Sequence, residues 1–162
     1  MVEIQLQDLI RKSLVKLVPA GSVGLFPFSF ETRLFDCEDF PIASPIVGSQ
    51  LVYTEKVQVL SFIVVDVGTL VRLGKLIFPK LDRKESLTMV VSAFEEILNT
   101  ASAKLGQLIA KIEGTQNAAI TPPMVLDFSG ENRISLSRKD STFLKMAYQD
   151  MSIDYAVTVQ MV

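Results

Sequence analysis

Histidine is absent from the 162 residues, and cysteine occurs once, at Cys37. Without an imidazole the chain cannot form a Ser-His-Asp triad, use a histidine general base or bind a metal through histidine. A single cysteine cannot form an internal disulfide or a cysteine-rich zinc site. Cys37 stands between Asp36 and Glu38, with no basic sequence neighbour to favour its thiolate, so we interpret it as a structural residue.

A surplus of basic residues and long hydrophobic runs are also missing. The 16 lysines and arginines are balanced by 18 acidic residues, whereas a protein that neutralises many phosphates needs excess positive charge. The longest apolar stretch runs from Val59 to Val65, is interrupted only by Ser61 and is followed by Asp66. It is far short of the ~20 residues that cross a bilayer. The first residues are acidic and polar, unlike a signal peptide. We therefore expect a soluble, cytoplasmic protein that binds neither nucleic acid nor membranes.

Hydrophobic residues make up 49% of the chain and charged residues 21%. This composition predicts one domain over 1–162, long enough to bury its own core. The mean hydropathy of +0.36 is high for a lone soluble domain. A self-associating surface would account for the apolar surplus.

The first third of the chain combines a helical pattern with a strand pattern. Apolar residues three and four apart predict a helix over 2–18, which Pro19 and Gly21 would end. Three phenylalanines then alternate with smaller residues, and this period of two predicts a strand within 22–35. The proline-containing stretch 37–45 is typical of a loop.

The rest of the chain is mostly strand-like, apart from two helices. Helical spacing is found over 68–78 and over about 82–112. The predicted strands are 46–53, 57–65, 118–128, 133–137, 143–149 and 155–161. This order predicts an α/β (α+β) sandwich, in which a mostly antiparallel sheet is covered by one long helix and shorter helices.

The long helix has recognisable ends and one apolar face. Asp82 with Glu85 three residues later is a capping pair, and Gly114 is a helix stop. Gly106 lies within the helix and would allow close packing. The apolar face consists of Val90, Phe94, Ile97, Leu98, Ala101, Leu105, Leu108, Ile109 and Ile112.

A polar stripe lies opposite this apolar face. Ser92, Glu96 and Asn99 are separated by four and three residues and share one side of the helix, which the small Ala103 continues. A Glu-x-x-Asn pair alone is typical of a solvated helix face. Pro122, however, follows Asn99 after a gap of 22 residues. With proline at about 5% of residues, that match alone is roughly a one-in-twenty coincidence.

These residues resemble the signature of the CheC/CheX/FliY phosphatases of bacterial chemotaxis. That signature is Asp or Ser, three residues, Glu, two residues, Asn, and after about 22 residues Pro. This chain has Ser92, Glu96, Asn99 and Pro122 at those positions. The CheC branch carries a second motif copy, but the helix at 68–78 contains neither Glu nor Asn. The resemblance is therefore to CheX, and it implies a CheC-like fold.

The resemblance implies hydrolysis of an aspartyl phosphate on a response-regulator receiver domain of the phospho-CheY type. Asn99 would orient the attacking water, and Glu96 would pair with a lysine of the receiver. Ser92 and Pro122 would be supporting residues. The receiver would supply Mg²⁺, so the chain would need no cofactor or metal of its own. The family also implies a homodimer, which would account for the apolar surplus.

Two features leave other interpretations open. Family members often have Gly four residues after the motif Asn, where this chain has Ala103 followed by Lys104. The N-terminal third does not align with the family. One alternative is a non-catalytic dimeric module that binds a receiver through the same helix. Another is a dimeric α/β domain whose polar stripe only faces water.

Overall fold

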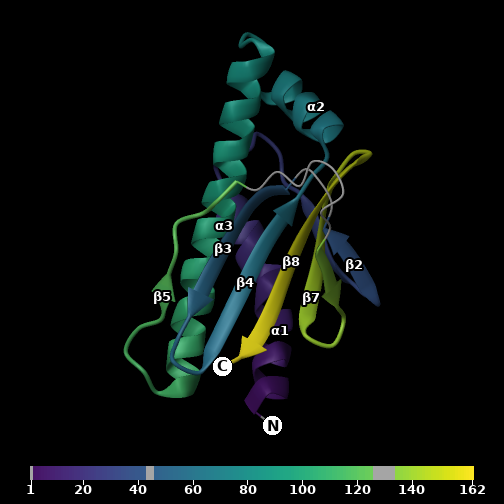
Figure 1. Ribbon diagram of the computed structural model, residues 1–162. Coiled ribbons are helices and arrows are strands. Elements are labelled where there is room, and N and C mark those ends of the chain that lie inside the picture. The colour runs from purple at the N-terminus through teal and green to yellow at the C-terminus, as the bar shows by residue number, and fades with distance from the viewer. Residues whose placement is uncertain (1, 43–45, 126–133) are drawn as a thin grey trace.

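A six-stranded antiparallel sheet is covered on one face by two long helices, and a short helix closes its upper end (Figure 1). The computed structural model describes residues 2–42, 46–125 and 134–162. The helices are α1 (Val2–Ser22), α2 (Val67–Ile77) and α3 (Arg83–Glu113). The strands are β1 (Glu31–Phe35), β2 (Asp39–Ile42), β3 (Ile46–Tyr53), β4 (Val57–Val64), β5 (Ala119–Ile120), β6 (Ile134–Ser137), β7 (Ser141–Tyr148) and β8 (Met151–Met161).

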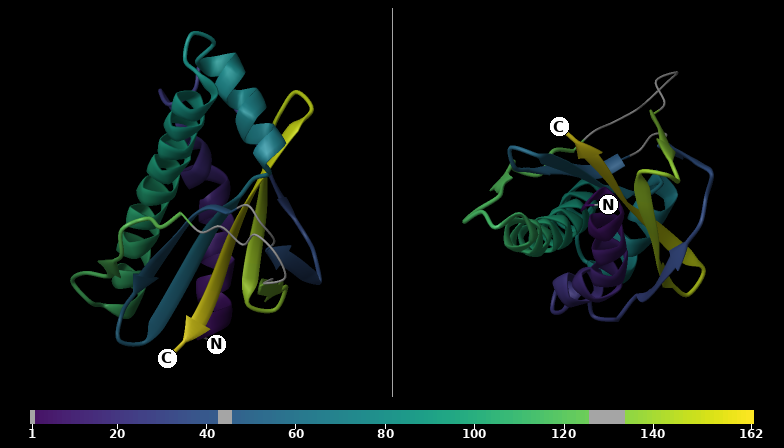
Figure 2. Two further views of the ribbon diagram at one scale, coloured as in Figure 1. Left: turned by 45° about the horizontal axis from the view of Figure 1, so that its top comes forward. Right: turned by 90° about the horizontal axis from the view of Figure 1, so that it is seen from below.

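The large sheet has the strand order β1-β7-β8-β4-β3-β5, and β2 pairs with β6 in a separate two-stranded sheet. Seen from below, α1 and α3 lie on the same side of the large sheet (Figure 2). On the opposite side, Phe40 of β2 and Leu136 of β6 pack with Phe62 and Phe143 of the large sheet. The α+β sandwich predicted from the sequence is therefore confirmed.

The main core lies between the large sheet and the helices. Alternate residues of β4, such as Val57, Val59 and Ile63, are at most 2% exposed because successive strand residues point to opposite faces. Most of the predicted apolar face of α3 is buried against them. Leu108 is only partly buried, and Ile112, in the last turn, is 43% exposed.

Both ends of α3 are as predicted. The Asp82 carboxylate accepts a hydrogen bond of 2.8 Å from the backbone N–H of Glu85, which satisfies one free donor of the first turn. At the other end Gly114 has φ of 69°, the left-handed conformation that glycine adopts without a steric penalty. Local contacts thus define both ends of α3, and with them the length of helix on which the polar stripe can lie.

The predicted end of the first helix at Pro19 was wrong. Pro19 lies inside α1, which continues to Ser22. Gly21 packs closely against α3, since a Cβ built there would lie 3.4 Å from the Ile97 carbonyl oxygen and 3.5 Å from Thr100 Cβ. Proline removes one helical hydrogen bond. Packing of the last turn of α1 against α3 offsets that loss.

Of the strand predicted within 22–35, only the part that forms β1 is confirmed. The earlier part consists of turns and irregular backbone, and the phenylalanines there gather as an aromatic cluster. The Phe26 and Phe30 rings meet nearly edge to face at 5.0 Å, and their centroids lie 5.3 and 6.4 Å from that of Phe94 on α3. The alternation of aromatic residues predicts a strand, but in the structure these rings are buried around Phe94 of α3.

The stretch 37–45 is not only a loop, since it contains β2. Pro41 lies within this strand, opposite Ser135 of β6. A proline is tolerated there because a two-stranded sheet has only edge strands. Residues 43–45 lie outside the described residues.

The strand predicted over 118–128 is shorter than expected. Only β5 is regular, with one further bridge between Met124 and Ser49. Two prolines, which have no N–H to donate, interrupt the pairing between them. Residues 126–128 lie outside the described part, as does Arg133 at the start of the next predicted strand, whose remainder is β6. The predicted hairpin of β3 with β4 is confirmed, and the final pair, β7 with β8, is longer than predicted.

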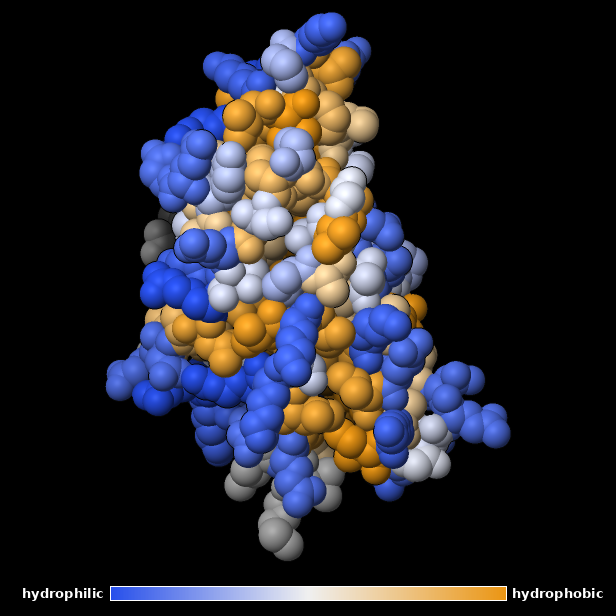
Figure 3. Space-filling model, turned by 180° about the vertical axis from the view of Figure 1, so that it is seen from behind, coloured by the Kyte–Doolittle hydropathy of each residue, from blue (hydrophilic) through white to orange (hydrophobic). Residues whose placement is uncertain are grey.

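Apolar side chains reach the surface in several patches separated by charged ones, as the view of the helix side shows (Figure 3). Val23, Met89 and Met124 are among the large apolar side chains that are more than a third exposed. Among the described residues no helix is long and apolar enough to cross a membrane. The homodimer expected from the sequence stays a prediction.

Phe94 joins α3 to the aromatic cluster and is fully buried. We expect Phe94→Ala to lower the free energy of unfolding by about 3–5 kcal/mol, because it removes apolar contacts and leaves a cavity. Met89→Ala, on the same helix at 47% exposure, should change it by no more than about 0.5 kcal/mol. Urea unfolding of the three proteins tests this, and equal losses in both variants would contradict the assignment of the core.

Candidate functional site

The polar stripe of α3 is presented to solvent by the burial of the opposite side of the helix. Ser92, Glu96 and Asn99 are exposed, whereas Phe94 and Leu98 are fully buried. Because α3 is held along the sheet by its apolar face, the stripe lies on the solvent side of the helix, with Asn99 at the edge nearest to β3. The structure thus brings the three helical motif residues to one accessible face, as the sequence predicted.

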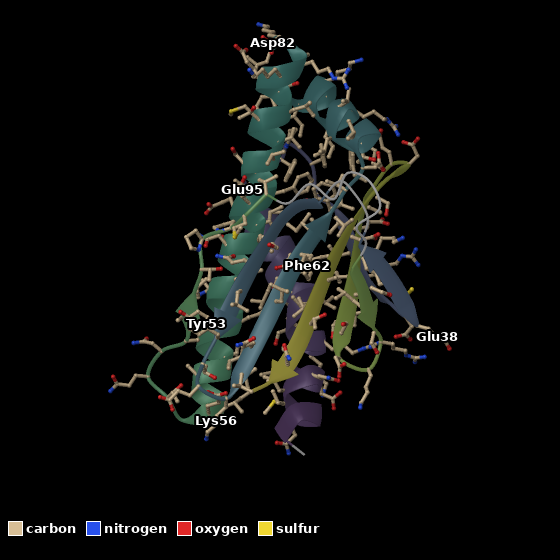
Figure 4. All side chains as sticks on the ribbon, viewed as in Figure 1. Glu38, Tyr53, Lys56, Phe62, Asp82 and Glu95 are labelled. Atoms are coloured by element: carbon tan, nitrogen blue, oxygen red, sulfur yellow. The ribbon has the colours of Figure 1, made fainter. Side chains whose placement is uncertain are left out.

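The carboxylate of Glu96 is available to a partner. Within the described part of the chain no lysine or arginine lies within ion-pair distance of it. Glu95, the next residue, is partly buried and lies along α3 between the level of Asp82 at the upper end of the helix and that of Tyr53 on β3 (Figure 4). Glu96 is one helical turn from Asn99, so their Cβ atoms are about 5–6 Å apart. A single partner could therefore contact both side chains.

Asn99 is held from below by Gln50, a residue of β3. The Gln50 side-chain nitrogen donates a hydrogen bond of 2.9 Å to the Asn99 side-chain oxygen and another of 2.8 Å to the backbone carbonyl of Thr121. Gln50 is only 1% exposed. The amide of Asn99 is thus the outer end of a hydrogen-bonded link to the sheet.

Sequence reasoning missed Gln50. The available signal was a polar residue within an apolar strand, at a position whose alternate neighbours, Gly48 and Val52, are buried. A lone glutamine in a strand does not indicate a site, because its partner on α3 lies 49 residues away. Only the register of the sheet brings the two amides together.

Pro122 lies beside this link. The chain around it pairs with β3 on both sides, through Thr121 N–H to the Leu51 carbonyl at 2.9 Å and through Met124 N–H to the Ser49 carbonyl at 2.8 Å. Pro122 and Pro123 fill the gap between these bonds, opposite Gln50. Neither proline donates a hydrogen bond to the ladder. The Leu51 N–H bonds to the Thr121 hydroxyl at 3.1 Å, and the Thr121 carbonyl accepts from the Gln50 side chain.

Asn99 and Pro122 are therefore brought to one place, through Gln50 and Thr121. Ser92 is not part of this link, since it lies seven residues before Asn99, about 10 Å along the helix. In the described residues its side chain makes no hydrogen bond to Glu96 or Asn99. The site thus has an anchored part at Asn99 and an outer part at Glu96 and Ser92.

Beyond Asn99 the stripe continues into a shallow groove between α3 and the segment that returns to the sheet. Ala103, Gly106 and Ala110 line it from the helix, and Ala118 and Ile120 line it from the returning segment. Apart from Ile120, these residues are alanine or glycine. A partner that contacts Asn99 can approach α3 closely at Ala103, although glycine is absent there.

Beneath Gln50 lies a buried polar layer. Ser61, the β4 partner of Gln50, is fully buried, as are Ser102 of α3 and Tyr155 of β8. Burial raises the pKa of Tyr155 well above its ordinary value, and the neighbouring Ser61 and Ser102 hydroxyls offset only part of this rise. The Gln50 side-chain oxygen is also buried, with no hydrogen-bond partner among the described residues.

A metal site needs several donor side chains close together. In residues 2–42, 46–125 and 134–162 no group of three or more Cys, Asp or Glu side chains could hold a metal ion. That the chain uses no cofactor of its own stays a prediction. The chemistry available at the exposed face is that of an amide, a carboxylate and a hydroxyl.

No protein-family model and no curated protein sequence matches the chain, but solved structures do. A putative chemotaxis protein from Desulfovibrio vulgaris Hildenborough has a TM-score of 0.67 at 10% identity, covering 94% of this chain and 97% of its own. A chain of the CheX–CheY–BeF3–Mg²⁺ complex from Borrelia burgdorferi has a TM-score of 0.58 at 14% identity, covering 92% and 96%. The FliM middle domain from H. pylori has a TM-score of 0.59 at 5% identity, covering 96% and 90%.

At sequence identities this low, structural similarity shows that two proteins share a fold. The chain has the fold of CheX and CheC-like chemotaxis proteins, so the fold that the motif implied is confirmed. The matches cover nearly the whole chain, including the N-terminal third that the sequence alone did not align.

The raised pKa of Tyr155 predicts an alkaline loss of stability. The unfolded chain releases the tyrosine proton near pH 10, whereas the folded protein retains it to higher pH. The free energy of unfolding therefore falls above about pH 10, by up to about 1.4 kcal/mol per pH unit for this one proton. Tyr155→Phe should lack this pH-dependent loss of stability.

Urea unfolding between about pH 8 and 11 measures the difference, with Tyr53→Phe at an exposed position as the control. A constant difference between wild type and Tyr155→Phe over this range would contradict the prediction.

Proposed function

We propose that the chain is a CheX-like phosphatase that hydrolyses the aspartyl phosphate of a response-regulator receiver domain of the CheY type. The observation that carries this proposal is the exposed amide of Asn99, held in a fixed orientation by the buried Gln50. Asn99 stands at the motif position on the long helix of a fold shared with CheX. One structural neighbour is a complex of CheX with CheY, BeF3 and Mg²⁺, which supports a receiver as the partner.

The proposed reaction needs positioning more than reactive groups. A water attacks phosphorus, the bond between phosphorus and the aspartyl oxygen breaks, and the products are inorganic phosphate and the free carboxylate. Most of the catalysis of phosphoryl transfer comes from alignment and electrostatic stabilisation. The outward NH₂ group of Asn99 can hydrogen-bond to the water or to a phosphoryl oxygen, so this residue can position the reactants without acting as a base. This suits a chain with no histidine.

Glu96 would align the two proteins. Its carboxylate is exposed and has no cation near it in the described residues, so it can pair with a lysine of the receiver. Two contacts one helical turn apart, at Glu96 and Asn99, would define both the place and the direction of docking. The receiver would supply the Mg²⁺, so this chain would contribute only side chains.

The other motif residues would support this arrangement. Pro122 would shape the chain directly after Thr121, whose carbonyl accepts a hydrogen bond from Gln50. Ser92, at the outer part of the site, would contact the receiver surface. A homodimer, expected from the apolar surplus, would leave this face of α3 free if the two copies meet through their sheets.

A second candidate function is a non-catalytic module that binds a receiver through α3. The same fold occurs in the FliM middle domain and in a FliM–SpeE complex from H. pylori. The fold is therefore also found in a protein that has been crystallised bound to another protein. The lifetime of the aspartyl phosphate separates the two candidates. A catalyst shortens it, whereas a binding module leaves it unchanged or lengthens it.

Asn99 is the residue on which the proposed catalysis depends. We expect Asn99→Ala to slow receiver dephosphorylation by about 100-fold or more, the scale seen when one positioned donor is removed from an active site. Asn99→Asp should be similarly slow, because a second negative charge would face the phosphoryl group. Decay of phosphate on receivers from the same organism measures the rates, with Asn117→Ala, at another exposed asparagine, as the control.

Both Asn99 variants should remain folded, since an exposed helix position tolerates alanine. Wild-type rates in Asn99→Ala would contradict the assignment of this residue. An unchanged phosphate lifetime with the wild-type protein, across all receivers of the organism, would favour the binding module.

Glu96 is expected to act mainly on docking. Glu96→Gln should weaken binding of a beryllofluoride-activated receiver by about 10-fold, equivalent to about 1.4 kcal/mol for a lost ion pair at an interface. Glu95→Gln changes the neighbouring carboxylate in the same way and should change the dissociation constant by less than about twofold. Calorimetric titration measures both. Equal weakening by the two variants would indicate general charge attraction in place of a specific pair.

A further inference from the structure

We infer that Gln50 is a positioning residue that fixes which end of the Asn99 amide faces the receiver. The inference rests on the proposed function and extends it to a strand residue outside the motif. Gln50 places the oxygen of Asn99 toward the sheet and its NH₂ group toward solvent. The carboxamide is then already oriented before a receiver binds.

The orientation follows from hydrogen-bond chemistry. The backbone carbonyl of Thr121 can only accept, so the group of Gln50 that faces it at 2.8 Å must be the NH₂. That same nitrogen lies 2.9 Å from the side chain of Asn99. Since an NH₂ group only donates, the atom of Asn99 that faces it must be the oxygen. Both amide orientations are therefore determined by one backbone carbonyl.

The link is well placed to restrict Asn99. Gln50 is 1% exposed and belongs to β3, which pairs with β4 on one side and with the returning segment on the other. A surface asparagine normally samples several side-chain orientations, and fixing one of them on binding costs entropy. In this protein the hydrogen bond from Gln50 already restricts the Asn99 side chain before a partner binds. The outward NH₂ can donate to an oxygen of the attacking water or of the phosphoryl group.

Gln50 is a poor choice for stability alone. Its side-chain oxygen is buried and has no hydrogen-bond partner among the described residues, and such a group is unfavourable in a core. Its neighbours on the same face of β3 are Gly48 and the fully buried Val52. An apolar side chain of similar size would remove the unpartnered oxygen. Its side-chain nitrogen serves two acceptors, the backbone carbonyl of Thr121 and the side chain of Asn99, and the second of these is the exposed amide of the site.

The test replaces Gln50 by methionine, which has a similar length and no amide. Gln50→Met should lower kcat for receiver dephosphorylation by about 10-fold, with KM changed by less than about twofold, because docking through Glu96 is intact. The variant should remain folded, with the urea midpoint lowered at most by the loss of the bond to the Thr121 carbonyl. In the Asn99→Ala background, Gln50→Met should have no further effect on kcat, since both act through one amide. Thr142→Val, at another buried polar strand residue, is the matched control and should leave kcat unchanged.

A second measurement does not depend on activity. In ¹⁵N NMR of the protein alone, the side-chain NH₂ of Asn99 should be rigid in the wild type and mobile in Gln50→Met. If the wild-type protein dephosphorylates no receiver, the proposed function fails, while this measurement still decides the role of Gln50. An Asn99 amide equally rigid in both proteins, an unchanged kcat, or a Gln50→Met protein that does not fold would each overturn the inference.

Discussion

The packing of α3 against β3 is the contact on which the rest of the site depends. The helix lies close to the strand because Gly48 has no side chain there, and a Cβ built at Gly48 would lie 3.2 Å from Leu98 Cδ2. This closeness brings the side chains of Gln50 and Asn99 within hydrogen-bonding distance. A wider separation would leave the exposed amide without its support, even though the helix and its polar stripe would be unchanged.

Local signals made α3 and its stripe predictable. Asp82 marks one end through its side-chain carboxylate and Gly114 marks the other through its left-handed backbone conformation. The shared face of Ser92, Glu96 and Asn99 follows from helix geometry. Gln50 was not predictable, because its role comes from strand register and from a residue distant in sequence. The strand predicted around Phe26 was wrong for the same reason. The burial of these aromatic residues against α3 is a tertiary contact, which alternation in the sequence does not reveal.

The similarity to chemotaxis proteins rests on architecture, with identities between 5 and 14% for the three structures compared. Such low identity with nearly full coverage is expected when a fold requires only a pattern of buried positions. Function depends on the few residues presented on that architecture. For the proposed function they would be the amide of Asn99, anchored by Gln50, and the carboxylate of Glu96, which has no ion-pair partner among the described residues.

The two adjacent prolines that interrupt the ladder beside β3 also affect how the sheet can grow. An edge strand with free N–H and C=O groups invites pairing with a strand of another molecule. At Pro122 and Pro123 an incoming strand would find no donors. A continuous sheet across two copies is therefore disfavoured at this segment, close to Asn99. The opposite edge, formed by β1, has no proline. Joining copies there would place the two sets of motif residues at the far ends of a common sheet.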